Sequence, residues 1–182
     1  MIIRVSNIAR HTFDHGPGIR MAIFFQGCLK HCKGCDKQDM WPMFGGTKTD
    51  TDEINKMIAS TPFFEGDGVS LTGGEPFLQP AQALAIARFA KQRGLSVWCY
   101  SGYTFEEIRE WNDARKELLK AIDVLVDGPF VEELKIDKSA ITEYSDNLWL
   151  KSSNQRVIDV KKSLKKGEVV LYESKSEEGS TL

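Results

Sequence analysis

Three cysteines stand close together in the first fifth of the sequence: Cys28, Cys32 and Cys35. The apolar run 19–25 directly before them is rich in β-branched and aromatic residues, which predicts a buried strand. The thiols therefore lie on a loop that leaves the end of a strand. Thiolates select soft metals, namely zinc, copper(I) and the iron of iron–sulfur clusters, so the loop predicts a site for one soft metal centre.

The number of cysteines narrows the kind of centre. Iron–sulfur clusters ordinarily take four cysteines, and structural zinc takes four ligands, often from two paired motifs. No second pair follows here, and the fourth cysteine, Cys99, is expected to be a small core residue. Three cysteines on a four-iron cluster leave one iron open, which is typical of a site for chemistry. The alternative is a zinc site whose fourth ligand is a histidine: His11, His15 or His31.

Further candidate residues follow the strands of a repeating strand–helix pattern. Strands are predicted over 69–71, 95–100 and 122–127, with helices between them. This alternation indicates the α/β class with a mostly parallel sheet, and the repeats are too few for a closed barrel. We therefore predict an incomplete (β/α) barrel. Such folds place their chemistry at the carboxyl ends of the strands, where this sequence has the cysteine loop and then Gly73, Gly74, Glu75, Ser101 and Asp127.

The other elements are predicted from local signals. Two helices are expected to begin with capping boxes, Asp50 with Glu53 and Thr104 with Glu107. We expect an edge strand over 2–8 and weaker strands over 156–160 and 169–172. Helices are expected over 52–60, from Pro80 to residue 94, and from residue 104 with a break at 112–113. A loop or short helix is expected over 132–147, and a polar tail at 174–182.

Composition excludes several classes of function. The 182 residues, 41% of them apolar, are most simply one domain over 1–182. The formal charge of -2 shows no basic excess, so nucleic acid is not an expected partner. There is no apolar segment long enough to span a membrane and no secretory leader. A cytoplasmic location is expected, and there clustered cysteines are more often metal ligands than disulfides.

Several motifs together resemble one enzyme family. The gaps of three and two residues between the cysteines resemble the cluster loop of the radical S-adenosylmethionine enzymes. The turn Gly16-Pro17-Gly18-Ile19-Arg20 before them resembles the signature of a subset, the glycyl-radical-enzyme activases, in which the turn helps to receive the target loop of a partner protein. The resemblance implies a 4Fe-4S cluster on the three cysteines, whose open iron binds S-adenosylmethionine. It also implies that Gly73, Gly74 and Glu75 hold the methionine end of that molecule.

The resemblance suggests four more contacts. Ser101 would border the ribose or carboxylate of S-adenosylmethionine, and Asp127 matches an acidic position near it. A turn-forming serine and a helix or turn cap are the respective alternatives. Asn154 and Arg156 lie in a stretch that resembles a late motif of the family and are candidates for contact with cofactor or partner, with a solvated surface as the alternative.

Four positions depart from the family pattern. His15 stands where family members often have Asp or Asn, and Asp36-Lys37 replaces an aromatic residue and an asparagine. Gly34 stands where many radical S-adenosylmethionine enzymes have an aromatic residue, but the small activators of anaerobic ribonucleotide reductase share this glycine. Gly34 and the short chain therefore favour those activators.

The implied function is reductive cleavage of S-adenosylmethionine. The product, a 5′-deoxyadenosyl radical, would take a hydrogen from one glycine of a partner enzyme, with anaerobic ribonucleotide reductase as the expected partner. Flavodoxin or ferredoxin would supply the electron. The alternatives are activation of another glycyl radical enzyme, a different radical S-adenosylmethionine reaction, and a non-catalytic zinc or iron–sulfur binding module.

Overall fold

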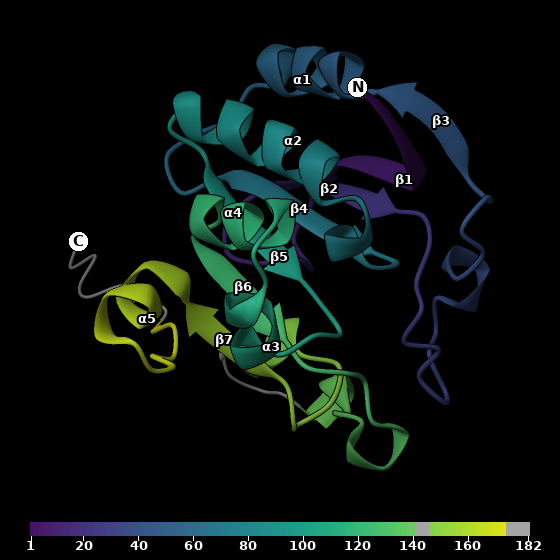
Figure 1. Ribbon diagram of the computed structural model, residues 1–182, viewed down its shortest axis with the longest axis vertical. Helices are drawn as coiled ribbons and strands as arrows, with labels where there is room; N and C mark the ends of the chain where they lie inside the picture. Colours follow the sequence, from purple (N-terminus) through teal and green to yellow (C-terminus); the bar gives the residue numbers. More distant parts are fainter. Residues whose placement is uncertain (141–145, 174–182) are drawn as a thin grey trace.

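The computed structural model describes residues 1–140 and 146–173 of the chain. Within them, seven strands form one sheet in the order β3-β1-β2-β4-β5-β6-β7 (Figure 1). The four central strands are parallel, as predicted, so their carboxyl ends meet at one edge. In chain order the strands are β1 (Ile2–Thr12), β2 (Arg20–Phe25), β3 (Thr47–Asp50), β4 (Gly68–Gly73), β5 (Ser96–Tyr100), β6 (Val124–Asp127) and β7 (Arg156–Asp159).

Antiparallel strands extend the parallel centre on both sides. β1 pairs with β2, β3 pairs with β1, and β7 pairs with β6. The prediction of an edge strand over 2–8 is wrong in its position, because β3 covers the outer side of β1. Since β3 is polar and short, its sequence carries no strand signal of its own. The sheet ends at β3 and β7 without closing on itself, which makes the fold an incomplete (β/α) barrel.

One face of the sheet carries the helices. In Figure 1, α1 (Thr51–Ser60), α2 (Pro80–Gln92) and α4 (Ala114–Ala121) lie side by side over the strands. Alternate strand residues such as Ile23, Leu71 and Leu125 point to this face and form the main core with apolar helix residues. Cys99 belongs to the same core and is fully buried, as predicted. The other helices are α3 (Phe105–Glu110) and α5 (Val160–Lys166).

The opposite face is covered by irregular chain that we call the covering segment, residues 128–140 and 146–152. It includes the short 3-10 helices η3 (Glu132–Leu134), η4 (Lys138–Ala140) and η5 (Asp146–Trp149). Trp149 packs edge-on against Trp98 of β5, with ring centroids 4.9 Å apart, inside a second apolar cluster. The sheet therefore lies between helices and the covering segment.

Most of the predicted helix signals are present. Thr104 and Glu107 form the capping box of α3, and Asp113 caps α4 after the predicted break. The capping box at Asp50 is wrong in part. Asp50 does cap α1 through the N–H of Asp52, but the carboxylate of Glu53 accepts from the Thr49 hydroxyl instead of turning back to the cap.

The carboxyl-terminal region departs from prediction in one element. The strand over 156–160 is confirmed as β7, but Leu171 makes only an isolated bridge to Ile158, so the strand over 169–172 is wrong. The predicted tail at 174–182 lies outside the described residues. The remaining 3-10 helices are η1 (Gln38–Met40) and η2 (Pro76–Leu78).

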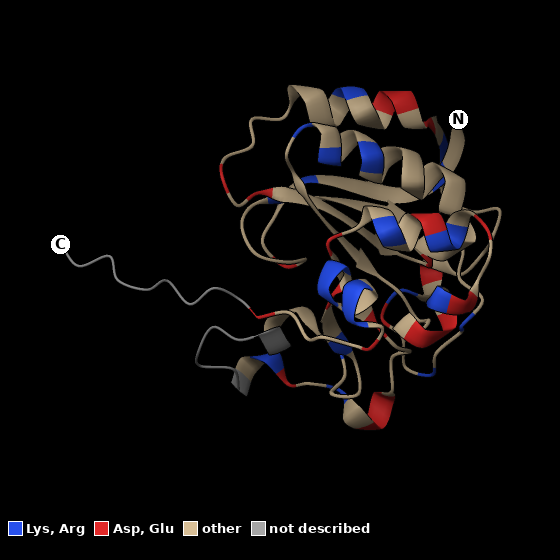
Figure 2. Ribbon diagram, turned by 60° about the vertical axis from the view of Figure 1, so that its left-hand side comes forward, with Lys and Arg blue, Asp and Glu red and all other residues tan. Residues whose placement is uncertain are grey.

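The surface carries charges of both signs. Blue and red residues are interspersed over the helices in Figure 2, in agreement with the near-neutral composition. Within 1–140 and 146–173, the structure contains no helix of the length and apolar character that crossing a bilayer requires.

Candidate metal and cofactor site

The three cysteines lie on the loop that leaves β2, as predicted. Cys28, Cys32 and Cys35 are half-buried, and each is a free thiol. The base of the loop is held by a second segment, because the Gly27 N–H donates to the Met40 carbonyl (2.8 Å) and the Cys28 N–H to the Trp41 carbonyl (3.1 Å). The loop is thus fixed where it begins.

A buried glutamine, missed by the sequence interpretation, holds the same two segments together. The side chain of Gln26 donates to the carbonyls of Asp39 (3.2 Å) and Pro42 (2.9 Å). The backbone carbonyl of Gln26 accepts from the side-chain amide of Gln79 (3.0 Å). Gln26 is 2% exposed, so these bonds are shielded from water. A polar residue immediately before Gly27-Cys28 at the end of an apolar strand was the available signal.

The donor set fits an iron–sulfur cluster better than one metal ion. Among the described residues, no three His, Cys, Asp or Glu side chains are placed to share a single ion. In a cluster each cysteine binds a different iron, so the sulfurs need not converge on one point. Two of the three histidines that were candidates for a fourth zinc ligand are engaged elsewhere. His31 is exposed and stacks on Trp41 at 4.6 Å, while His15 packs against Phe24 and Tyr100 on the sheet.

The covering segment leaves no room for a side chain at Gly34. A Cβ at this position would lie 2.5 Å from Oε1 of Glu132, and the φ of +72° also favours glycine. The Lys33 ammonium pairs with the same carboxylate at 3.1 Å. The space where many family members have an aromatic side chain is therefore occupied by Glu132.

Gly73 and Gly74 bring β4 into contact with the base of the cysteine loop. The Gly74 N–H donates to the Phe25 carbonyl and the Glu75 N–H to the Gly27 carbonyl, both at 2.8 Å. A Cβ at Gly74 would lie 2.4 Å from the Gly27 oxygen. The backbone at these glycines therefore approaches the chain itself closely, and this contact joins the two motifs directly.

Glu75 and Ser101 are brought together, as their strand-end positions predict. Glu75 is 1% exposed, and its carboxylate accepts from the N–H groups of Phe77 (3.0 Å) and Gly102 (2.8 Å) and from the Ser101 hydroxyl (3.1 Å). Burial raises the pKa of Glu75 from 4.5 to about 7. The charge of Lys30, on the cysteine loop, opposes this rise in the pKa, and the Lys30 ammonium lies 3.8 Å from the centre of the Tyr103 ring. A nearby cation stabilises the charged form of a buried carboxylate.

The pKa of Glu75 predicts a pH dependence of stability. Because the folded pKa lies above the unfolded value, the folded protein binds the proton more tightly, and the stability due to this group decreases as pH rises from about 5 to about 7. We expect the free energy of unfolding of the wild type, relative to Glu75→Gln, to decrease by about 2 kcal/mol over that range. Urea unfolding of both proteins at several pH values measures the difference. A constant difference would contradict the prediction.

Asp127 lies at the same edge but is engaged within the chain. Its carboxylate accepts from the Phe105 N–H (2.7 Å) at the start of α3 and pairs with the Arg156 guanidinium (3.0 and 2.5 Å). Arg156 also pairs with Glu106. Asn154 donates to the Pro129 carbonyl at 2.8 Å. The cap proposed as the alternative for Asp127 is therefore present, and contact of these residues with a cofactor stays a prediction.

The ion pair of Asp127 is expected to matter for stability. Asp127 is 1% exposed, so Asp127→Asn leaves part of the Arg156 guanidinium without its buried partner. We expect a loss of about 3 kcal/mol in the free energy of unfolding, measured with urea. Glu106→Gln removes the exposed arm of the same network and is the matched control, with a loss below about 1 kcal/mol. Equal losses in the two variants would contradict this assignment.

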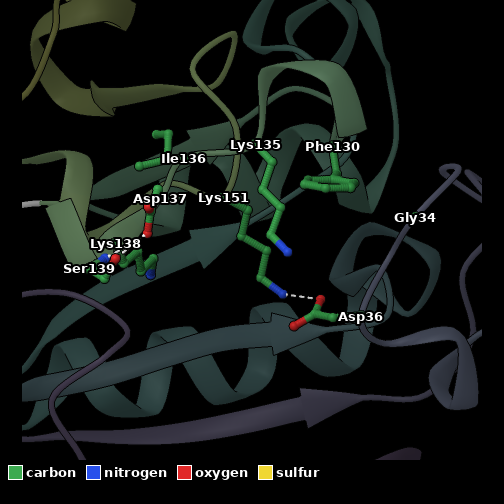
Figure 3. Close-up of a pocket in the computed structure, with 9 residues that line it drawn as sticks. All are labelled: Gly34, Asp36, Phe130, Lys135, Ile136, Asp137, Lys138, Ser139 and Lys151. Atoms are coloured by element: carbon green, nitrogen blue, oxygen red, sulfur yellow. Dashed lines mark hydrogen bonds and ion pairs between the residues drawn. The ribbon is translucent and has the colours of Figure 1, made fainter.

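A cavity of about 620 Å³ opens between the cysteine loop and the covering segment (Figure 3). Gly34 and Asp36, on the two sides of the third cysteine, line it together with Phe130. In Figure 3 the Lys151 side chain reaches across toward Asp36, and the two form an ion pair of 2.5 Å. The cavity also has Lys135, Ile136, Asp137, Lys138 and Ser139 in its lining, so a ligand can approach the loop through a partly cationic space.

Comparison with known proteins agrees with this geometry. Residues 15–158 match the family described as "4Fe-4S single cluster domain". The chain is 34% identical over 151 residues to the anaerobic ribonucleoside-triphosphate reductase-activating protein of Escherichia coli K12, covering 79% of this chain and 90% of that protein. The protein of that name from phage T4 is 31% identical over 153 residues, which is 80% of this chain and 86% of the relative.

A second group of relatives carries a different name. The pyruvate formate-lyase-activating enzyme of Clostridium pasteurianum is 34% identical over 127 residues, 66% of this chain and 53% of that enzyme. The chain therefore belongs to the radical S-adenosylmethionine activases with a single 4Fe-4S cluster, the family of the anaerobic ribonucleoside-triphosphate reductase-activating proteins.

Proposed function

We propose that this protein activates anaerobic ribonucleotide reductase by installing a glycyl radical. The observation that carries the proposal is the direct backbone pairing of the cysteine loop with Gly74-Glu75, since it puts a cluster site beside a buried carboxylate at the carboxyl edge of the sheet. When bound to the three cysteines and reduced by one electron from an external donor, a cluster would supply that electron for the cleavage of S-adenosylmethionine to methionine and a 5′-deoxyadenosyl radical, which would take hydrogen from a glycine.

The chain's own residues would bind and orient. Cys28, Cys32 and Cys35 would hold three irons and leave the fourth for the amino and carboxylate groups of S-adenosylmethionine. The Glu75 carboxylate, already fixed by three donors, would accept from the ammonium group, with Gly73 and Gly74 allowing close approach. Ser101 and Asp127 are proposed to border the rest of the molecule, Ser101 through its bond to Glu75 and Asp127 by fixing the start of α3.

The partner and the electron donor follow from the same family. The relatives that share most of their length with this chain are named for activation of anaerobic ribonucleoside-triphosphate reductase, which favours that enzyme as the partner. Flavodoxin or ferredoxin would be the donor, and the reaction would take place in the cytoplasm in a single domain. A second candidate partner is a pyruvate formate-lyase, supported by the relative from Clostridium pasteurianum.

The test is anaerobic activation with purified components. The reconstituted protein is reduced with dithionite and mixed with S-adenosylmethionine and either anaerobic ribonucleotide reductase or pyruvate formate-lyase. We expect 5′-deoxyadenosine by chromatography and a glycyl radical by electron paramagnetic resonance on the reductase alone. A radical on the lyase alone would favour the second candidate. Zinc in place of iron, or no cleavage by a reduced cluster with the partner present, would refute the proposal.

A further inference from the structure

Exposed apolar side chains lie on the cysteine loop and on the segment that is hydrogen-bonded to its base. Three large apolar side chains there are exposed: Leu29 (60%), Met43 (37%) and Phe44 (86%). We call these residues the apolar patch. Side chains of this kind on a protein surface, when they gather at one place, mark sites of contact with other proteins.

The apolar patch is built next to the first cysteine. Leu29 follows Cys28 directly, and Met43 and Phe44 follow Trp41, whose carbonyl accepts from the Cys28 N–H. Met43 also packs against Gly27, where a Cβ would lie 2.9 Å from the methionine sulfur. A protein that binds at the apolar patch would therefore bring its surface close to the metal site.

The other side of the loop is already engaged. Lys33 pairs with Glu132 at 3.1 Å, and Asp36 pairs with Lys151 at 2.5 Å, so the covering segment is held against this side. The cavity through which a substrate can approach lies there as well. The apolar patch is thus the exposed face of the loop that the covering segment and the cavity do not use.

Two basic residues lie at the Phe44 end of the apolar patch. The Arg4 guanidinium lies 5.9 Å from the centre of the Phe44 ring, and Lys48 is directly opposite Arg4 across β1 and β3. Local charge of this sign attracts an acidic partner and guides it to its contact.

We propose that the apolar patch is the docking surface for an acidic protein that delivers single electrons to the cluster. This inference rests on the proposed function, because it needs a cluster on the three cysteines. In each event the donor protein is oxidised by one electron and the cluster is reduced by one electron. The substrate side and the donor side then lie on different faces of the loop, so the two proteins can be bound at once.

The test compares two sources of electrons. The double variant Leu29→Ser/Phe44→Ser and wild type are assayed for 5′-deoxyadenosine with reduced flavodoxin and with dithionite, which needs no docking. We expect the KM for flavodoxin to rise about tenfold or more, as for loss of interface anchors, with the dithionite-driven rate within about twofold. Phe64→Ser, a similarly exposed aromatic residue (73%) outside the loop, is the matched control and should change neither rate.

A second variant and a direct binding measurement complete the design. Lys48→Glu should weaken the binding of oxidised flavodoxin and reduce its salt dependence, as measured by calorimetry. Unchanged flavodoxin binding in both variants would overturn the proposal, and so would weaker binding of the reductase with flavodoxin binding intact. If wild type with a reduced cluster gives no cleavage with dithionite in the presence of the reductase, the proposed function fails, while the calorimetry still decides whether the apolar patch binds the donor.

Discussion

Replacement of Cys32 by alanine is expected to abolish the cleavage of S-adenosylmethionine. The three cysteines come from one loop, and the described residues provide no group of ligands that could take over. Without one of three thiolates the cluster is held weakly or lost, and we expect 5′-deoxyadenosine to decrease at least about 100-fold. The measurements are iron content, absorbance near 400 nm and product chromatography after anaerobic reconstitution.

Cys99 provides the matched control for this experiment. It is the fourth cysteine, but it lies fully buried among apolar side chains, and burial raises the pKa of its thiol well above the ordinary value. Cys99→Ala should keep iron content and activity and cost about 1 kcal/mol of stability, as for the removal of one small buried group. Loss of iron from Cys99→Ala, or full activity in Cys32→Ala, would show that the assignment of ligands is wrong.

The parts of the fold and site that sequence reasoning predicts are those with local causes. Cysteine spacing, the glycines before Glu75 and the capping box at Thr104 depend on neighbours within a few residues. The convergence of the cysteine loop, Glu75 and Ser101 follows from one further step, because the carboxyl ends of parallel strands meet at one edge.

The parts that sequence reasoning misses depend on distant pairing. β3 is polar and becomes a strand only because β1 offers it a free edge. The ion pair of Asp36 with Lys151 joins residues 115 positions apart, and nothing near either residue indicates the other. The sequence also did not favour either alternative for Asp127, because the same carboxylate can cap a helix or contact a ligand. Its ion-pair partner Arg156 is 29 positions away, so nothing near Asp127 indicates the pair.

Arg20 shows how a motif can have a structural cause that its sequence does not reveal. The side chain is fully buried, and its guanidinium donates to the Ser70 hydroxyl (2.6 Å), the Pro17 carbonyl (3.1 Å) and the Val69 carbonyl (2.8 Å). It also donates to the hydroxyl and carbonyl of Ser96. Burial lowers its pKa to about 10, so it stays charged at neutral pH. The last residue of the Gly-Pro-Gly-Ile-Arg signature thus ties the turn to the adjoining strands.

Arg20→Lys is therefore expected to cost at least about 3 kcal/mol in the free energy of unfolding. A lysine has one ammonium group and cannot reproduce the planar fork of donors, so buried acceptors lose their partners at about 1–3 kcal/mol each. Urea unfolding under anaerobic conditions measures the loss. Arg115→Lys is the matched control, because Arg115 pairs with Asp113 at the surface and its replacement should cost less than about 1 kcal/mol.

Arg20→Lys also tests whether Arg20 holds the signature turn in place or takes part in the chemistry. If Arg20 acts by holding the turn, Arg20→Lys lowers the free energy of unfolding, but the folded fraction still cleaves S-adenosylmethionine with dithionite. Cleavage is kept because Arg20 lies at the amino end of β2, whereas the cysteines follow its carboxyl end. If the turn receives the partner's loop, as the family resemblance implies, activation of the partner enzyme is expected to decrease more than cleavage, because the turn is no longer fixed. A variant with normal stability and no cleavage would instead place Arg20 in the chemistry, against the geometry of its five bonds.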